Sequence, residues 1–193
     1  MGASESASSA PGFTLGVDFG TTNTVVALAL PGEPAQLVRF PAPEGELFAF
    51  RSALAFHAPP EHPTERTVEA GPWAIEAYVE DPLETRFIQS FKTFAASANF
   101  TETQILGRRY AFEDLLSAFL LKLRDHAGAA LNDLPGRVIV GRPVTFAGAA
   151  PKAELALARY ETAFSRLGFS EILYVYEPVG AAFFFARTLK ADA

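Results

Sequence analysis

Residues 14–20 read TLGVDFG, and this stretch decides how the rest of the sequence is interpreted. Large apolar residues alternate in it with Gly16 and Asp18, and a period of two predicts a β-strand. The residues that follow, GTTN at 20–23, are typical of a tight turn, and TVVALAL at 24–30 is a second β-branched and apolar run. The sequence therefore predicts a β-hairpin near its start.

After this hairpin the pattern changes to alternating helices and strands. Further strands are expected at about 38–40, 47–57, 137–141 and 172–176, and helices at about 72–80, 111–131, 151–167 and 178–189. Several of these helices begin at a proline, which a first helical turn tolerates because its N–H groups have no partner within the helix. The order predicts an α/β fold, with a mixed sheet that starts with an antiparallel hairpin and carries helices on both faces.

Composition and charge restrict the possible classes of protein. The chain has 193 residues, 49% of them hydrophobic, which is enough for one large domain or two small ones. It carries 16 Lys and Arg against 22 Asp and Glu, so its formal net charge is -6. This acidic balance disfavours a nucleic-acid backbone or an anionic membrane as the main partner. We therefore expect neither a nucleic-acid partner nor membrane binding.

Cysteine usage and the N-terminal residues indicate the compartment. The sequence contains no cysteine, which excludes disulfides, thiolate metal sites and cysteine nucleophiles. Residues 1–12 are small and polar without a basic or apolar region, so they are interpreted as a flexible lead and not as a secretion signal. The longest apolar run, near 24–31, is far shorter than the roughly 20 residues of a membrane span. We expect a cytoplasmic protein.

The turn at 20–23 has the residue types that bind phosphate. Backbone N–H groups and the hydroxyls of Thr21 and Thr22 can converge on one point, and Gly20 lets the backbone approach a ligand closely. Asp18, just before the turn, can hold Mg²⁺ through water. On spacing alone, an ordinary hairpin with a buried, capped Asp18 remains an alternative.

Four segments carry a resemblance to a known family. DFGTTNTVVAL closely resembles the first phosphate loop of the actin-like ATPases, in particular of the DnaK-type (70-kDa heat-shock) chaperones. The other three segments follow in the family's order: PWAIEAY with FIQSFKTF, RVIVGRPVTF, and YVYEPVGAA. The resemblance covers about residues 13–190, and the GRPV form suggests the divergent YegD-like branch. It implies a ribonuclease-H-like, actin-like ATPase lobe with a small inserted subdomain at about 40–110.

The resemblance also implies roles within an ATP or ADP site with Mg²⁺. Asp18 would orient Mg²⁺-bound water, and Thr21 and Thr22 would contact the β- and γ-phosphates. Gly20 and Asn23 would shape the loop.

Three more residues come from the later segments. Lys92 would reach the γ-phosphate and help place the attacking water, and Glu177 would hold water in the outer shell of the metal. Pro143 would be the hinge-side proline that senses the nucleotide. Each of these residues also has an alternative interpretation: Lys92 as a snorkelling surface lysine, Glu177 as a residue favoured at a helix N-terminus, and Pro143 as a strand terminator.

The family's second lobe supplies another phosphate turn, of the form D-x-G-G-G-T, and no such turn occurs in these 193 residues. We therefore expect this chain to be the first lobe, from a longer parent protein. The isolated lobe would bind ATP weakly and hydrolyse it negligibly. The parent would be an ATP hydrolase that acts with an unfolded client or a co-chaperone.

Three other functions fit parts of the same pattern. An actin-like cytoskeletal or division protein would polymerise under nucleotide control, whereas a chaperone would show peptide-stimulated turnover. A ribonuclease-H-like nuclease would use Asp18 and Glu177 around two metals, and its activity would be indifferent to ATP. A degenerate lobe would only bind a partner.

Overall fold

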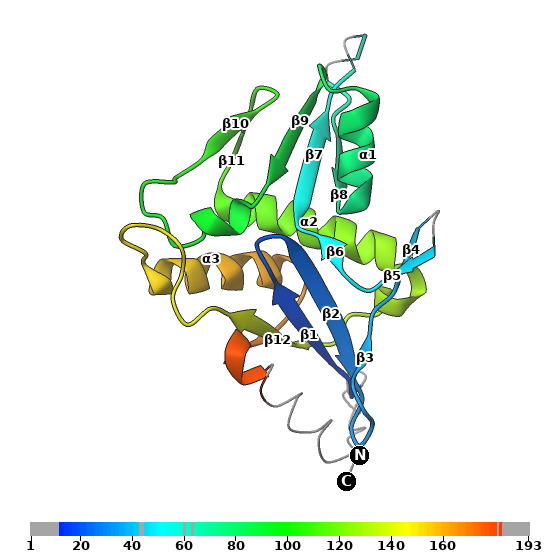
Figure 1. The fold of residues 1–193 in the computed structure, drawn as a ribbon, viewed down its shortest axis with the longest axis vertical. Coiled ribbons are helices and arrows are strands. Elements are labelled where there is room, and N and C mark those ends of the chain that lie inside the picture. Colours follow the sequence, from blue (N-terminus) through cyan, green and yellow to red (C-terminus); the bar gives the residue numbers. More distant parts are fainter. Residues whose placement is uncertain (1–11, 43–44, 60, 63, 181, 183–193) are drawn as a thin grey trace, which may run out of the picture.

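A computed structural model describes residues 12–180 and 182, apart from 43–44, 60 and 63. The strands are β1 (Thr14–Phe19), β2 (Asn23–Ala29), β3 (Gln36–Leu37), β4 (Phe40–Ala42), β5 (Gly45–Leu47), β6 (Phe50–Arg51), β7 (Ala53–His57), β8 (Thr67–Ala70), β9 (Thr85–Gln89), β10 (Thr103–Ile105), β11 (Arg108–Tyr110), β12 (Arg137–Arg142) and β13 (Glu171–Tyr176). The helices are α1 (Pro72–Glu80), α2 (Phe112–Ala127) and α3 (Ala153–Arg166), with 3₁₀ helices η1 (Phe91–Phe94) and η2 (Gly128–Leu131). In Figure 1, α2 and α3 run across the middle, between a lower sheet around β1 and an upper sheet around β7.

The lower, main sheet has the strand order β13-β12-β1-β2-β3, and β6 also pairs with β2. Strands β1 and β2 are antiparallel, in a register that runs from Thr14 opposite Ala29 to Phe19 opposite Thr24. Strands β12 and β13 continue the sheet in parallel with β1. The predicted hairpin, the mixed sheet and the general α/β class are therefore confirmed.

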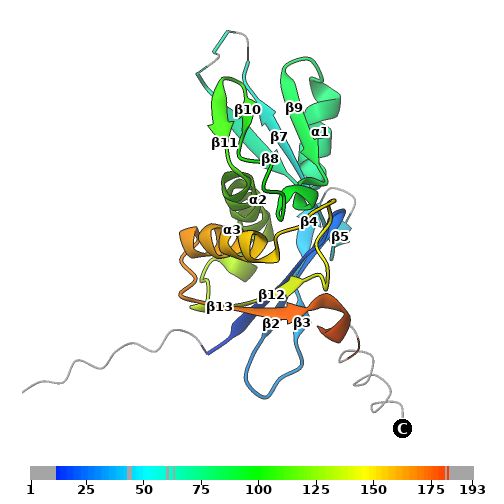
Figure 2. The ribbon, with the colours of Figure 1, turned by 90° about the vertical axis from the view of Figure 1, so that its left-hand side faces the viewer.

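Both long helices pack against one face of this sheet. The ring centroid of Phe19 lies 5.6 Å from that of Phe119 on α2 and 6.0 Å from that of Tyr160 on α3. Figure 2 shows the two helices on the same side of β12 and β13. The opposite face carries the exposed side chains of Ile139 and Leu173. Residues 177–180 are helical, and most of the remaining positions of the helix expected at 178–189 lie outside the described residues.

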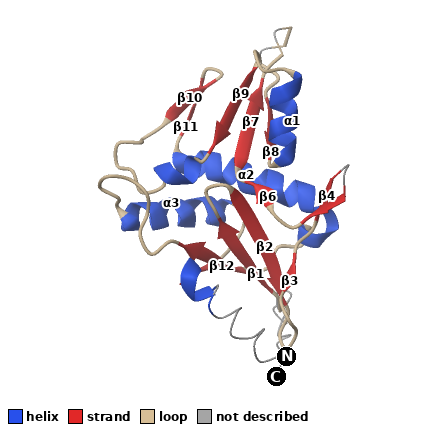
Figure 3. Cartoon of the chain, viewed as in Figure 1, coloured by secondary structure: helices blue, strands red, loops and turns tan. Residues whose placement is uncertain are grey.

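The upper sheet has the order β8-β7-β9, and all of its pairs are antiparallel. Alternate residues of β7 face opposite sides: Leu54 and Phe56 belong to the main core with α2, and Ala53 and Ala55 pack against Ala74 of α1. This sheet therefore lies between α1 and α2, as Figure 3 also shows.

The single strand predicted at 47–57 is wrong. This stretch is divided among β5, β6 and β7. Between β6 and β7, Ser52 leaves the strand pairing, and its amide donates to the carbonyl of Thr22, at 2.8 Å. Strands β8 to β11 were not predicted from the sequence. They are short, and their polar and charged residues obscure any alternation of apolar side chains.

The predicted helix at 111–131 divides into α2 and η2. Its start is stabilised by Asp114, whose carboxylate accepts a 2.7 Å hydrogen bond from the amide of Ala111. The helix at 151–167 begins two residues late, at Ala153, because Lys152 is extended. Within the described part of the chain, no helix combines the length and the apolar character that crossing a bilayer requires.

Candidate functional site

A buried lysine and a glutamate meet at the end of the main sheet. Lys92 Nζ in η1 donates to Glu177 Oε1, directly after β13, at 2.7 Å, although the residues are 85 positions apart. The Lys92 side chain is 9% exposed, and its ammonium lies 5.8 Å from the centre of the Phe19 ring. A charge this buried needs a partner. Lys92 is therefore not a solvated surface lysine, and Glu177 is its counter-ion.

Asp18 lies beside this pair, at the end of β1. A Cβ atom built on Gly141 would be 3.4 Å from Asp18 Oδ1 and 3.4 Å from Glu177 Cγ, so both acidic side chains border the same glycine. Desolvation raises the pKa of Asp18 above its ordinary value, and the nearby Glu177 raises it further, while Lys92 opposes the change. Two carboxylates with one ammonium leave an excess of negative charge, which suits a hydrated divalent cation.

The pKa of Asp18 predicts a pH-dependent stability. The folded state holds the Asp18 proton more tightly than the unfolded state, so this stabilisation is complete below pH 3.8 and is lost as the pH rises through the folded pKa. The Asp18→Asn substitution should therefore raise the Tm at pH 7 and leave it unchanged at pH 3. The rise should be small because Asp18 keeps contact with solvent. Thermal unfolding by circular dichroism measures it, with Asp133→Asn as the control. A lower Tm at pH 7 would contradict this electrostatic description.

The turn at 20–23 is closed by its own backbone and braced from outside. The Gly20 amide donates to the carbonyl of Asn23 at 3.0 Å. Ser52 Oγ donates to the Gly20 carbonyl at 2.8 Å and lies 3.0 Å from Thr24 Oγ1. The side chains of residues 21–23 stay exposed, which leaves the two threonine hydroxyls accessible.

Gly20 has no room for a side chain. A Cβ atom there would lie 2.3 Å from the Asn23 carbonyl oxygen, and this backbone atom cannot move without opening the turn. We expect Gly20→Ala to cost about 1–3 kcal/mol of the free energy of unfolding, the usual range for overpacking. Urea denaturation measures this cost. Gly180→Ala, where no atom of the described residues lies within 4 Å of the added Cβ, is the control and should not destabilise the chain.

Two small cavities gather most of the predicted site residues. One, of about 160 Å³, is lined by Thr21, Lys92, Pro143 and Glu177, together with Thr93 and residues 145–147. A second, of about 300 Å³, lies on the open face of the sheet and includes Asp18, Gly141 and again Glu177. The site is thus centred on Glu177, which borders both cavities.

Three predicted residues line neither of these cavities. They are Gly20, Thr22 and Asn23, whose backbone groups contact one another within the turn and also contact Ser52 and Arg51. Within the described ranges, no group of three or more His, Asp or Glu side chains forms a cluster that could hold a metal ion directly.

Sequence reasoning did not assign Ser52 or Arg159 to the site. Ser52 is 2% exposed and holds the turn, while Arg159 binds the segment that follows Lys92. The local signal for Arg159 is a positive charge on a helix whose buried residues are mostly apolar. Ser52 has none, because a serine within an extended run is common.

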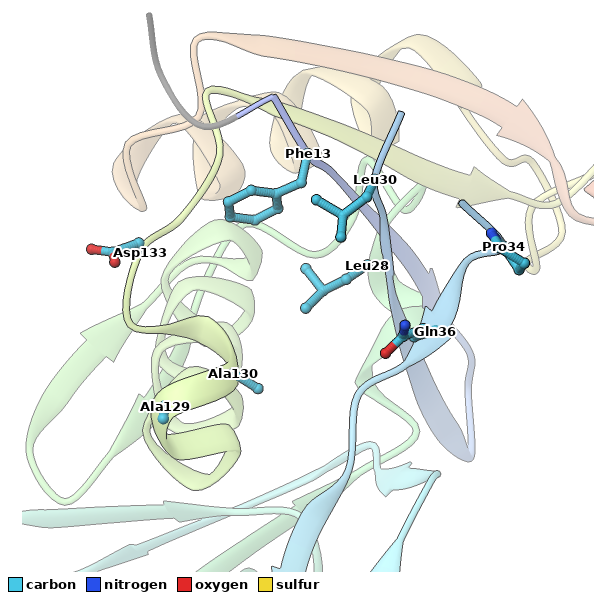
Figure 4. Close-up of a pocket in the computed structure, with 8 residues that line it drawn as sticks. All are labelled: Phe13, Leu28, Leu30, Pro34, Gln36, Ala129, Ala130 and Asp133. Carbon is cyan, nitrogen blue, oxygen red and sulfur yellow. The ribbon is translucent and has the colours of Figure 1, made fainter. Parts of the chain in front are cut away.

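A third hollow lies at the opposite end of the main sheet. Figure 4 shows Phe13, Leu28 and Leu30 lining it from the sheet, across from Ala129 and Ala130 of η2. Its volume is about 290 Å³, and its lining is largely apolar. It includes none of the predicted site residues.

No protein-family model matches the sequence. The functional assignment therefore depends on the site itself and on the resemblance of its motifs.

Proposed function

We propose that this chain is the first lobe of an actin-like ATPase domain of the DnaK type, and that the Lys92–Glu177 end of the main sheet binds the phosphates of ATP. The observation that carries the proposal is the 2.7 Å contact between Lys92 and Glu177, which joins two separate motifs beside Thr21. Burying an ammonium group costs free energy. A hairpin that binds no ligand would not need such a group beside its turn.

The order of the main sheet supports the ribonuclease-H-like, actin-like fold. An antiparallel β1–β2–β3 unit is followed by β12 and β13, which lie parallel to β1. Asp18, Pro143 and Glu177, which are predicted to bind the nucleotide and its metal, then lie where β1, β12 and β13 end. In open α/β sheets, the crevice outside the carboxyl ends of parallel strands is a common position for a bound ligand.

Each residue has a role that fits its surroundings. Lys92 supplies positive charge to the γ-phosphate, and Thr21 and Thr22 offer hydroxyl donors. Asp18 and Glu177 hold Mg²⁺ through water, in keeping with their excess negative charge. When bound, Mg²⁺ neutralises charge on the phosphate oxygens.

We expect ATP binding by this chain to be weak. The cavity beside Lys92 has about 160 Å³, less than the roughly 300–1,000 Å³ of pockets that enclose a whole ligand. It accommodates the phosphate end, and the adenosine contacts would come from a second lobe. The activity of the parent, an ATP-driven chaperone that acts with an unfolded client or co-chaperone, belongs to the same proposal.

Isothermal titration of the 193-residue chain with ATP tests the proposal. We expect a dissociation constant on the order of 0.1–1 mM with Mg²⁺, weaker binding with EDTA, and no such Mg²⁺ effect in Asp18→Asn. Asp133→Asn, at the other end of the sheet, should behave as wild type. Absence of ATP binding would contradict the proposal, and metal-dependent nuclease activity that ignores ATP would favour the nuclease alternative.

A further inference from the structure

The segment that carries Lys92 is held by its own backbone only through single turns, in which the Thr93 amide donates to the Ser90 carbonyl and the Ala95 amide donates to the Lys92 carbonyl. Before it, Ser90 adopts the left-handed conformation, with φ 57° and ψ 22°, which costs a non-glycine residue energy. After it, residues 95–102 form neither helix nor strand. Contacts from elsewhere in the fold therefore add to these turns in holding Lys92 against Glu177.

Arg159 on α3 supplies those contacts. Its Nη1 donates to the carbonyls of Phe94, Ala95 and Ser97 at 3.0, 2.9 and 3.2 Å, and its Nη2 donates to the carbonyl of Phe100. One guanidinium group thus serves four carbonyls of the segment that follows Lys92.

The guanidinium of Arg159 is itself held in place. The side chain is 11% exposed, and its Cζ lies 5.9 Å from the centre of the Phe112 ring. Its Nε is 3.9 Å from the carboxylate of Glu113. The amide of Lys152, just before α3, adds a 2.9 Å hydrogen bond to the carbonyl of Ala96.

We propose that Arg159 is a positioning residue, which fixes Lys92 at the proposed phosphate site by binding the backbone of the segment that follows it. Only arginine fits this role, because its planar fork presents five donors whereas lysine has a single charged point. The functional part of this inference rests on the proposed ATP site, and the structural part does not.

Amide hydrogen exchange and ATP titration test the inference together. In Arg159→Met, the amides of Thr93 and Ala95 should exchange about tenfold faster while that of Ala163 in α3 is unchanged, because only the segment loosens. ATP affinity should fall about tenfold, the value of one charged hydrogen bond. Adding Arg159→Met to Lys92→Met should cause no further loss, since both act through the same ammonium group.

Arg166→Met is the control, because Arg166 is also on α3 but pairs with Asp114, at 2.7 Å, and is 46% exposed. It should change neither readout. Arg159→Lys provides the same comparison if Arg159→Met does not fold. Unchanged exchange at Ala95, or a loss of affinity that adds fully to that of Lys92→Met, would overturn the inference. If the wild-type chain binds no ATP, the proposed function is wrong. The amide exchange rate at Ala95 in Arg159→Met then decides by itself whether Arg159 positions the segment that follows Lys92.

Discussion

The Lys92→Met substitution is expected to weaken ATP binding to the 193-residue chain about 10- to 100-fold, because a hydrogen bond to a charged group contributes about 1.5–3 kcal/mol. Methionine keeps the length of the side chain and removes its charge. Glu177 then loses its counter-ion next to Asp18, so the site becomes more negative and repels the phosphates. Isothermal titration with ATP in the presence of Mg²⁺ measures the change.

A second paired lysine gives a matched control for this prediction. Lys122 contacts Glu69 at 3.2 Å and lies on α2, outside both cavities of the site. Lys122→Met should therefore leave ATP binding unchanged. If Lys92→Met folds and binds ATP as tightly as wild type, Lys92 does not contact the phosphates.

The Phe19→Ala substitution should produce the largest loss of stability, about 3–5 kcal/mol, as for other buried aromatic residues. Phe19 is fully buried, and its ring centroid lies 5.4 Å from that of Phe91, the neighbour of Lys92. The ring also packs against both α2 and α3, so the cavity would form where the sheet, the two helices and the site meet. The total stability of a domain is only about 5–15 kcal/mol, and part of the population should unfold at 37 °C.

Urea denaturation measures this loss, with Phe48→Ala as the control. Phe48 is 45% exposed, and its ring packs under the guanidinium of Arg39 at 5.4 Å. We expect that control to cost less than about 1 kcal/mol. A loss below about 1 kcal/mol for Phe19→Ala would contradict the packing described here.

The parts of the fold with a strong local pattern were predictable. Strand β1 alternates around Asp18, and α2 has apolar residues at helical spacing, so both were expected at nearly their observed positions. The β1–β2 hairpin was predictable because GTTN at 20–23 separates two apolar runs by a short turn. The gathering of Lys92 and Glu177 was expected only from the resemblance, since no local pattern links residues so distant in sequence.

The parts that depend on long-range contacts were not predictable. Ser52 interrupts an otherwise regular extended run, because it binds a turn some thirty positions earlier. Arg159 binds carbonyls that lie about sixty positions before it, and no spacing rule relates the two segments. Phe94, two residues after Lys92, is 45% exposed and stacks on Phe100, with ring centroids 5.0 Å apart. Tertiary contacts decide these positions, and a single sequence does not encode them in a local pattern.

NMR can show whether the end of the sheet around Lys92 and Glu177 binds nucleotide phosphates. Amide ¹H–¹⁵N spectra of the labelled chain would be recorded during a titration with ADP and Mg²⁺. We expect the largest shift changes on residues 20–23, on Lys92 and Thr93, and on Glu177. Shift changes confined to the apolar hollow around Leu28, or no change at all, would contradict it.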